Sequence, residues 1–65
     1  MIKKLWIARD ESNNLELFEE KPVYIIVPGI GGGWEGACTI GYINRDSFPS
    51  VTFENSPQQV EIKLI

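Results

Sequence analysis

The sequence contains one cysteine and no histidine. A single cysteine excludes an intramolecular disulfide, and a chain without histidine is a poor candidate for a zinc site. Histidine is also the usual base that activates a cysteine nucleophile, so its absence argues against thiol catalysis. We therefore interpret Cys38 as a small buried residue of a strand, and we predict neither a metal site nor a catalytic residue.

The sequence also lacks the features of membrane and exported proteins. It has no apolar run of about 18 residues, the length that a membrane-spanning helix requires. Its first residues do not show the basic, apolar and small-residue regions of a secretory signal. We expect a cytoplasmic protein that does not enter a membrane.

Basic residues are few, with six against nine acidic residues and a formal net charge of -3. Nucleic-acid binding derives its affinity from basic residues that contact phosphates, so a nucleic-acid partner is not expected. Lys3, Lys4 and Arg9 form a local basic cluster, which we interpret as the solvated end of an edge strand.

What the chain does contain is sufficient for one folded domain. Of its 65 residues, 43% are hydrophobic and 23% are charged, which is typical of a globular rather than a disordered chain. We expect residues 1–65 to form a single small domain. A chain this short buries only about 60% of its surface on folding, so tight packing or self-association must supply part of its stability.

The clearest structural pattern is a β-hairpin near the start. Residues 5–10 and 15–21 alternate in polarity and flank a polar segment in which Asn13 and Asn14 suit a turn. Alternation places the predicted core on one face of this hairpin, at Leu5, Ile7, Leu15 and Leu17. Trp6 and Phe18 fall on the other face.

Two further strands are predicted in the middle of the chain. Residues 23–27 are apolar at every position, which favours burial on both faces. Residues 37–43 form another β-prone run, with Gly41 as a bulge. We interpret the glycine-rich residues 29–36 between them as the flexible loop of a second hairpin.

The last third of the chain contains turns and one closing strand. Residues 44–50 have turn chemistry throughout. Ser56, Pro57 and Gln59 resemble the start of a helix, but the residues that follow alternate with a period of two. We therefore predict a turn at residues 56–59 and a strand at residues 60–64. The chain as a whole is predicted to be mostly β, a small antiparallel sheet of four to six strands with little or no helix.

Glycines at positions 31, 33 and 36 match the pattern G-x-G-x-x-G. A dinucleotide site also needs a helix after the glycines and an acidic residue about 20 residues further on. A β-prone run follows here instead, and the lysine of a phosphate-binding loop is absent. We predict no cofactor, and at most a backbone nest for a small anion.

The acidic side chains do not form a catalytic pattern. Most of the candidate carboxylates fall at solvent positions of alternating strands: Glu16, Glu19, Glu20, Glu54 and Glu61. A pair of carboxylates also needs a substrate cleft, which a domain of this size can hardly enclose. We predict that the protein is not an enzyme.

The aromatic residues give the best indication of a contact surface. Strand parity gathers four apolar residues on the face opposite the core: Trp6, Phe18, Tyr24 and Ile26. We favour the chain's own residues 44–59 as the cover of this face, through Phe48, Val51 and Phe53. The alternative is a second subunit or another protein. Trp34, in the glycine-rich segment, is a separate exposed candidate.

Two segments have a familiar pattern. The first is W-I-A-R-D at residues 6–10 followed by L-E-L-F-E-E-K-P at residues 15–22. The second is D-S-F-P-S-V-T-F-E-N-S-P at residues 46–57, which runs into V-E-I-K-L at residues 60–64. About half of the chain thereby resembles a set of short uncharacterised proteins of gut bacteria, phages and mobile elements. The resemblance implies a genomic context, and it implies no activity and no site residues.

Our first hypothesis is a non-catalytic intracellular protein-interaction module of phage or mobile-element origin. It is a homodimer or binds another protein through Trp6, Phe18, Tyr24 and Trp34. The alternative is a binder of single-stranded nucleic acid or of a small anion. Nucleic acid would stack on Trp6, Trp34 and Tyr42 beside the basic cluster, and an anion would use the glycine-rich segment.

Overall fold

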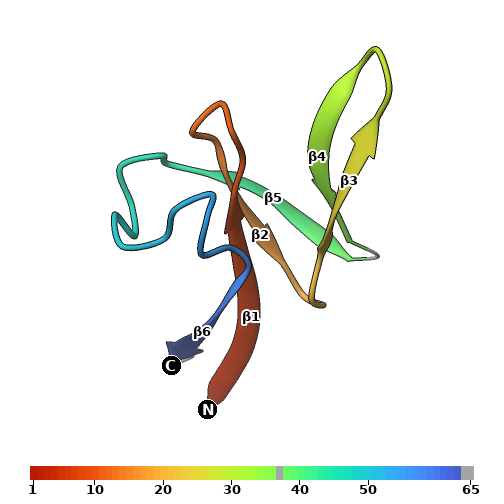
Figure 1. Ribbon diagram of the computed structural model, residues 1–65. Coiled ribbons are helices and arrows are strands. Elements are labelled where there is room, and N and C mark those ends of the chain that lie inside the picture. Colours follow the sequence, from red (N-terminus) through yellow and green to blue (C-terminus); the bar gives the residue numbers. More distant parts are fainter. Residues whose placement is uncertain (37, 64–65) are drawn as a thin grey trace.

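The fold is an antiparallel all-β arrangement, as the sequence predicts. The computed structural model describes residues 1–36 and 38–63. These residues contain no helix, and therefore none that is long and apolar enough to cross a membrane. The six strands are β1 (Ile2–Arg9), β2 (Leu15–Phe18), β3 (Val23–Val27), β4 (Gly31–Glu35), β5 (Thr39–Ile43) and β6 (Gln58–Lys63) (Figure 1).

The strands form two separate sheets. Four of them make an antiparallel sheet in the order β5-β2-β1-β6, and β3 pairs with β4 alone. In the hairpin of β1 and β2, Trp6 faces Phe18 and Ile7 faces Leu17 across the strands. The turn is closed by the Asp10 carboxylate, which accepts hydrogen bonds from the backbone of Ser12 and Asn14, both at 2.9 Å. The predicted hairpin is thereby confirmed.

The core lies on the predicted face of this hairpin. Leu5, Ile7 and Leu15 are buried there, and Leu17 packs against them partly buried. Val51 completes the cluster from the long segment between β5 and β6. This position corrects one expectation, because the segment covers the face of Ile7 and not the face of Trp6 and Phe18.

The second face of the sheet meets the other hairpin at Phe18 and at the end of β1. Phe18 is only 1% exposed, and the backbone of Gly36, just after β4, lies against its ring. Trp34 of β4 reaches the end of β1 and donates a hydrogen bond from its indole Nε1 to the carbonyl oxygen of Arg9 at 3.0 Å. Phe18 is therefore covered by the chain just after β4, and not by residues 44–59.

The middle of the chain differs from the sequence prediction in its pairing. The glycine-rich residues form strand β4, and the turn lies earlier, at residues 28–30, where Ile30 donates a backbone hydrogen bond to Val27 at 3.0 Å. Pro28 cannot continue the strand ladder, and Gly29 adopts a φ of 83° that suits a tight turn. β3 therefore pairs with β4, and β5 pairs with β2.

Two burial predictions are also wrong. β3 was expected to be buried on both faces, yet four of its five residues are exposed, with Ile26 at 72%. Cys38 was expected to be a buried strand residue, but it is exposed and precedes β5. An all-apolar run predicts burial only if other layers lie on both sides of it, and β3 belongs to a two-stranded sheet.

The predictions for β5 and β6 agree with the structure where it describes them. Gly41 has a φ of 137°, and the pairing of β5 with β2 shifts register opposite Leu17 and Phe18, as expected for a bulge. The closing strand begins two residues earlier than predicted, at Gln58, after a cis peptide bond between Ser56 and Pro57. Ala37 and Leu64, which were assigned to strands, lie outside the described residues.

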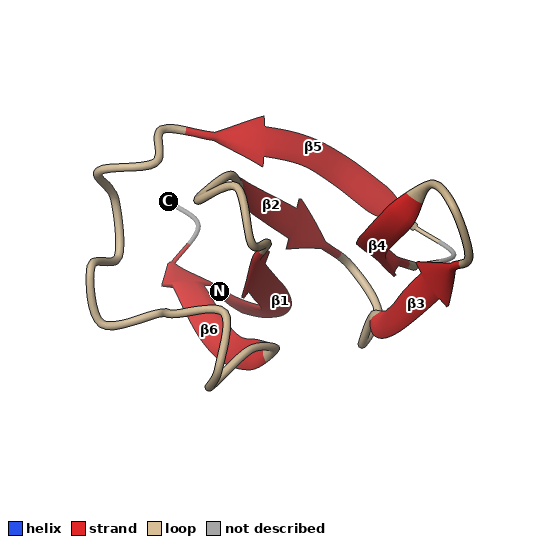
Figure 2. Cartoon of the chain, turned by 45° about the horizontal axis from the view of Figure 1, so that its top comes forward, coloured by secondary structure: helices blue, strands red, loops and turns tan. Residues whose placement is uncertain are grey.

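The hairpin of β3 and β4 projects from the four-stranded sheet, and we call it the β-arm (residues 23–35). Figures 1 and 2 show it to one side of the other strands, with its turn at the far end. Its base is closed where the backbone N–H of Glu19 donates to the carbonyl oxygen of Cys38 at 2.8 Å. The β-arm is thus an insertion between two strands, β2 and β5, that pair with each other.

The contact between Gly36 and Phe18 can be tested with a matched pair of substitutions. A Cβ at position 36 would lie 2.7 Å from Phe18 Cδ2, whereas a Cβ at Gly33 would meet nothing within 4 Å. We expect Gly36→Ala to lower the free energy of unfolding by about 1–3 kcal/mol through overpacking, and Gly33→Ala to leave it unchanged or slightly raised. Urea unfolding measures both, and equal stability of the two variants would contradict the packing described above.

Candidate functional site

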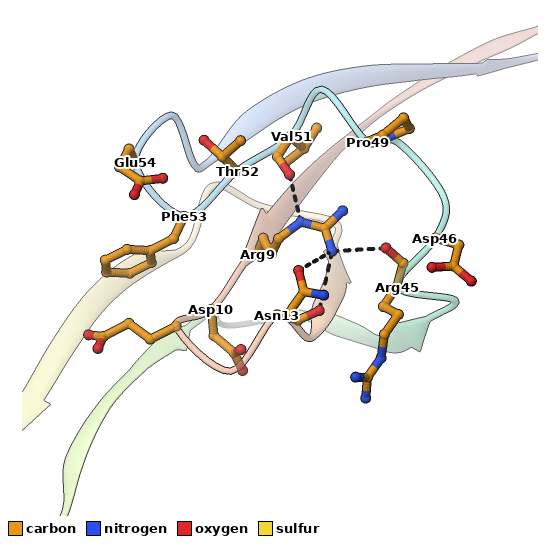
Figure 3. A pocket seen from close by; sticks show the side chains of 11 residues that line it. Arg9, Asp10, Asn13, Arg45, Asp46, Pro49, Val51, Thr52, Phe53 and Glu54 are labelled. Atoms are coloured by element: carbon orange, nitrogen blue, oxygen red, sulfur yellow. Dashed lines mark hydrogen bonds between the residues drawn. The ribbon is translucent and has the colours of Figure 1, made fainter.

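The most highly bonded side chain in the described structure is that of Arg9, at the end of β1. It is only 7% exposed, which corrects its assignment to a solvated basic cluster. Its Nε donates to the carbonyl oxygen of Val51 at 2.6 Å, and one terminal nitrogen donates to the carbonyl oxygen of Arg45 at 2.9 Å (Figure 3). The remaining acceptors are the carbonyl and side-chain oxygens of Asn13 and the carbonyl oxygens of Ser47 and Phe48.

These contacts assign Arg9 an organising role. Its described hydrogen bonds go to backbone carbonyls and one side-chain amide, and none goes to a carboxylate. The planar guanidinium holds several donors in a fixed geometry, which allows it to collect carbonyls from different parts of a loop. It also holds Phe48, whose φ of 51° is unusual for a residue other than glycine.

A cavity of about 450 Å³ lies beside Arg9, between the turn of the first hairpin and residues 45–54. Four carboxylates line it: Asp10, Glu11, Asp46 and Glu54. Two of these four serve the fold, because Asp10 closes the turn and the Glu11 carboxylate accepts a hydrogen bond from the Tyr24 hydroxyl at 2.7 Å. Among the described residues, no group of acidic residues and cysteine has the geometry of a metal site.

Three aromatic rings attach the β-arm to the rest of the protein. Tyr24 meets Trp34 and Phe53 edge to face, with ring centroids 5.1 Å apart in both pairs. Tyr24 and Trp34 are also paired across the arm, so both side chains point to the same side of it. Together with the bonds to Arg9 and Glu11, these rings form an aromatic latch (Tyr24, Trp34 and Phe53) at the end of the first hairpin.

The predicted interaction residues do not form one exposed surface. Phe18 is buried in the described structure and is unavailable to a partner. Tyr24 and Trp34 are half-buried in the aromatic latch. Trp6 is half-buried on the sheet, with Lys21 Nζ 5.5 Å from its ring centroid. Of the four residues that strand parity was expected to gather, namely Trp6, Phe18, Tyr24 and Ile26, only Ile26 is largely open to solvent.

The residues of the alternative nucleic-acid site are dispersed as well. Arg9 is buried and bonded to carbonyls, and Tyr42 borders a second cavity of about 270 Å³ together with Trp34. Asp10, Glu16 and Glu35 line the same cavity, and their charge disfavours phosphate. The glycines proposed as an anion nest are paired with β3, and the Tyr24 side chain lies over Gly32.

Sequence reasoning missed an exposed apolar surface on the β-arm. Its exposed side chains are Val23, Ile25, Ile26, Val27 and, at the turn, Ile30. They belong to a stretch, residues 22–34, that contains no charged residue at all. The absence of charge over this whole stretch was the signal in the sequence that could have indicated an exposed contact strand. Apolar composition alone could not, because a buried strand and an exposed contact strand are equally apolar.

Comparisons with known proteins do not assign the chain to a family. No family model, curated protein or solved structure matches the chain. The resemblance of residues 6–22 and 46–64 to short bacterial and phage-associated proteins therefore stays a prediction.

The organising role of Arg9 predicts that lysine cannot replace it. Lysine keeps the charge but lacks the planar fork, so several buried carbonyls lose their donors. We expect Arg9→Lys to lower the free energy of unfolding by about 3 kcal/mol and to expose the backbone amides of residues 47–51 to hydrogen exchange. Arg45→Lys is the matched control, because Arg45 is exposed and its side chain makes one contact, at 3.5 Å. Equal urea midpoints for the two variants would refute this role.

The bond between Tyr24 and Glu11 predicts a pH effect. Donating to the Glu11 carboxylate raises the pKa of Tyr24 above 10.0, and partial burial and the negative charges of Glu11 and Asp10 raise it further. Because the raised pKa belongs to the folded state, this bond stabilises the fold below about pH 10, and the stabilisation is lost as the pH rises through the folded-state value.

Tyr42→Phe leaves Tyr24 as the one remaining tyrosine of the two in the sequence, so absorbance at the tyrosinate band then follows Tyr24 alone. In this background, Glu11→Gln should move the titration of Tyr24 to lower pH. An unchanged titration would show that the bond is absent in solution.

Proposed function

We propose that the protein is a non-catalytic protein-interaction module and that the β-arm is its binding element. The observation that carries the proposal is the exposure of β3, a strand of apolar residues that lies outside the core. Exposed contiguous apolar surface on a small protein is typical of a contact site. The two cavities offer less support for catalysis, because Arg9, Asp10 and Glu11 in the larger one hold turns and loops together.

The charge distribution supports the same function. Between residues 22 and 44 the only charged residue is Glu35, although 23% of the whole chain is charged. Charged side chains are depleted at the centre of protein interfaces, and a surface built for solvent alone would carry them. The β-arm is therefore better suited to contact another protein than to remain in water.

The outer edge of β3 supports a specific mode of binding. Within the described residues β3 pairs with β4 only, so one row of its backbone donors and acceptors has no strand partner. Natural edge strands are protected by short length, proline, charges or bulges. Pro22 and Pro28 bound β3, but within its five residues it has no charged residue and pairs with β4 in an unbroken register. An extended segment of a partner can add to such an edge as a further strand.

The proposal can be tested with a photo-crosslinking amino acid at a single position in the chain. Ile26 on the β-arm is 72% exposed, and Tyr42 on β5, the matched control, is 70% exposed. We expect discrete protein adducts from position 26 in cells that produce the chain, and few or none from position 42. Absence of adducts at position 26, or equal adducts at both positions, would overturn the proposal.

A further inference from the structure

We infer that the occupant of the β3 edge is a second copy of the same chain, which pairs its own β3 antiparallel to the first. This inference rests on the proposed function and identifies the partner of that same surface. Two β-arms joined in this way form one four-stranded sheet in the order β4-β3-β3-β4, related by a two-fold axis at the contact.

The sequence of β3 is compatible with its own copy. An antiparallel pairing centred on Ile25 places Val23 opposite Val27 and Tyr24 opposite Ile26, so all five positions pair apolar residues. A net charge of -3 disfavours contact between two copies in general, but β3 itself has no charge to repel its equivalent. This is the part of the surface where self-contact costs least electrostatically.

The direction of the side chains also suits a paired arm. Tyr24 and Trp34 point from the arm toward the rest of the protein, where they bond to Glu11 and Arg9. Alternation then turns Val23, Ile25 and Val27 to the opposite side, where their cross-strand neighbours are Glu35, Gly33 and Gly31. The two glycines leave this row largely uncovered, and pairing extends it into a continuous row of six apolar side chains.

The size of the contact predicts a weak dimer. A fully exposed aliphatic side chain presents on the order of 100 Å² of apolar surface. Weighted by their exposed fractions, which run from 42% to 72%, the four exposed side chains of β3 offer roughly 200 Å² per copy. A stable interface buries about 800 Å² per partner, which is several times this area, so we expect a weak dimer that forms only at high protein concentration, with backbone hydrogen bonds supplying part of the attraction.

The flanking prolines favour a closed dimer over an open fibre. Pro22 and Pro28 stand immediately before and after β3, and neither can donate a hydrogen bond to a strand ladder. They confine pairing to the five residues between them. Because the contact uses the same edge on both copies, one pairing consumes this edge on both and growth through β3 stops.

The first experiment is sedimentation equilibrium of the purified chain over a wide concentration range, with two matched variants. Ile25→Lys places like charges opposite each other at the two-fold axis, and we expect it to raise the dissociation constant at least tenfold. Ile40→Lys is the control, because Ile40 is also exposed, at 51%, but lies on β5. Circular dichroism and urea unfolding confirm that both variants keep the fold.

A second experiment tests the register directly. In a Cys38→Ser background, Ile25→Cys should form a disulfide-linked dimer quickly under mild oxidation, since the two copies meet at this position. Ile40→Cys should do so no faster than random collision allows. Rapid crosslinking at position 25 alone supports the pairing, and equal rates at the two positions overturn it.

The outcomes separate this inference from the proposed function. A wild-type chain that is monomeric at all concentrations, or a dimer that Ile40→Lys disrupts as strongly as Ile25→Lys, overturns the inference. If photo-crosslinking from position 26 then yields adducts with other proteins, the interaction function stands and the partner is a different chain. If neither association nor adducts occur, both proposals fail.

Discussion

The structure depends on one buried cation. Arg9 ends the longest strand and donates hydrogen bonds to the turn of the first hairpin and to three parts of the segment between β5 and β6. A protein of 65 residues has a thin core, and its long irregular segment contributes one core side chain, Val51. The guanidinium keeps the Val51 side chain in that core because it donates a hydrogen bond to the backbone of Val51 itself. Hydrogen bonds from one side chain thus replace the secondary structure that this segment lacks.

Sequence reasoning was reliable where periodicity and turn chemistry act locally. The hairpin of β1 and β2 and the bulge at Gly41 follow from alternation and backbone preference within a few residues. It was unreliable where the answer depended on distant neighbours. Apolar residues in β3 look alike whether they are buried or exposed, and the role of Arg9 depends on carbonyls 36 to 42 residues away in the chain. Of the predicted contact residues, Tyr24 and Trp34 hold the β-arm against the rest of the protein, and Phe18 is buried.

The β-arm and the four-stranded sheet have different roles in the molecule. The sheet, Arg9 and Val51 provide the fold, and the aromatic latch fixes the orientation of the arm relative to it. The arm carries a row of exposed apolar residues, and Glu35 is its only charged residue. An isolated two-stranded hairpin is marginally stable in water, so the latch on one side and an added strand on the other are complementary means of supporting it.

A hydrogen bond from the Glu19 N–H to the Cys38 carbonyl oxygen closes the base of the β-arm. This closure has a consequence for how the sequence of such a protein can vary. Insertions are tolerated best where the two ends of a segment lie close together, because the host structure is then undisturbed. The segment that leaves β2 and returns to β5 satisfies this condition. Chains with the same four-stranded sheet could therefore exchange arms of different length and composition, and acquire different binding preferences, without redesigning the sheet or the network around Arg9.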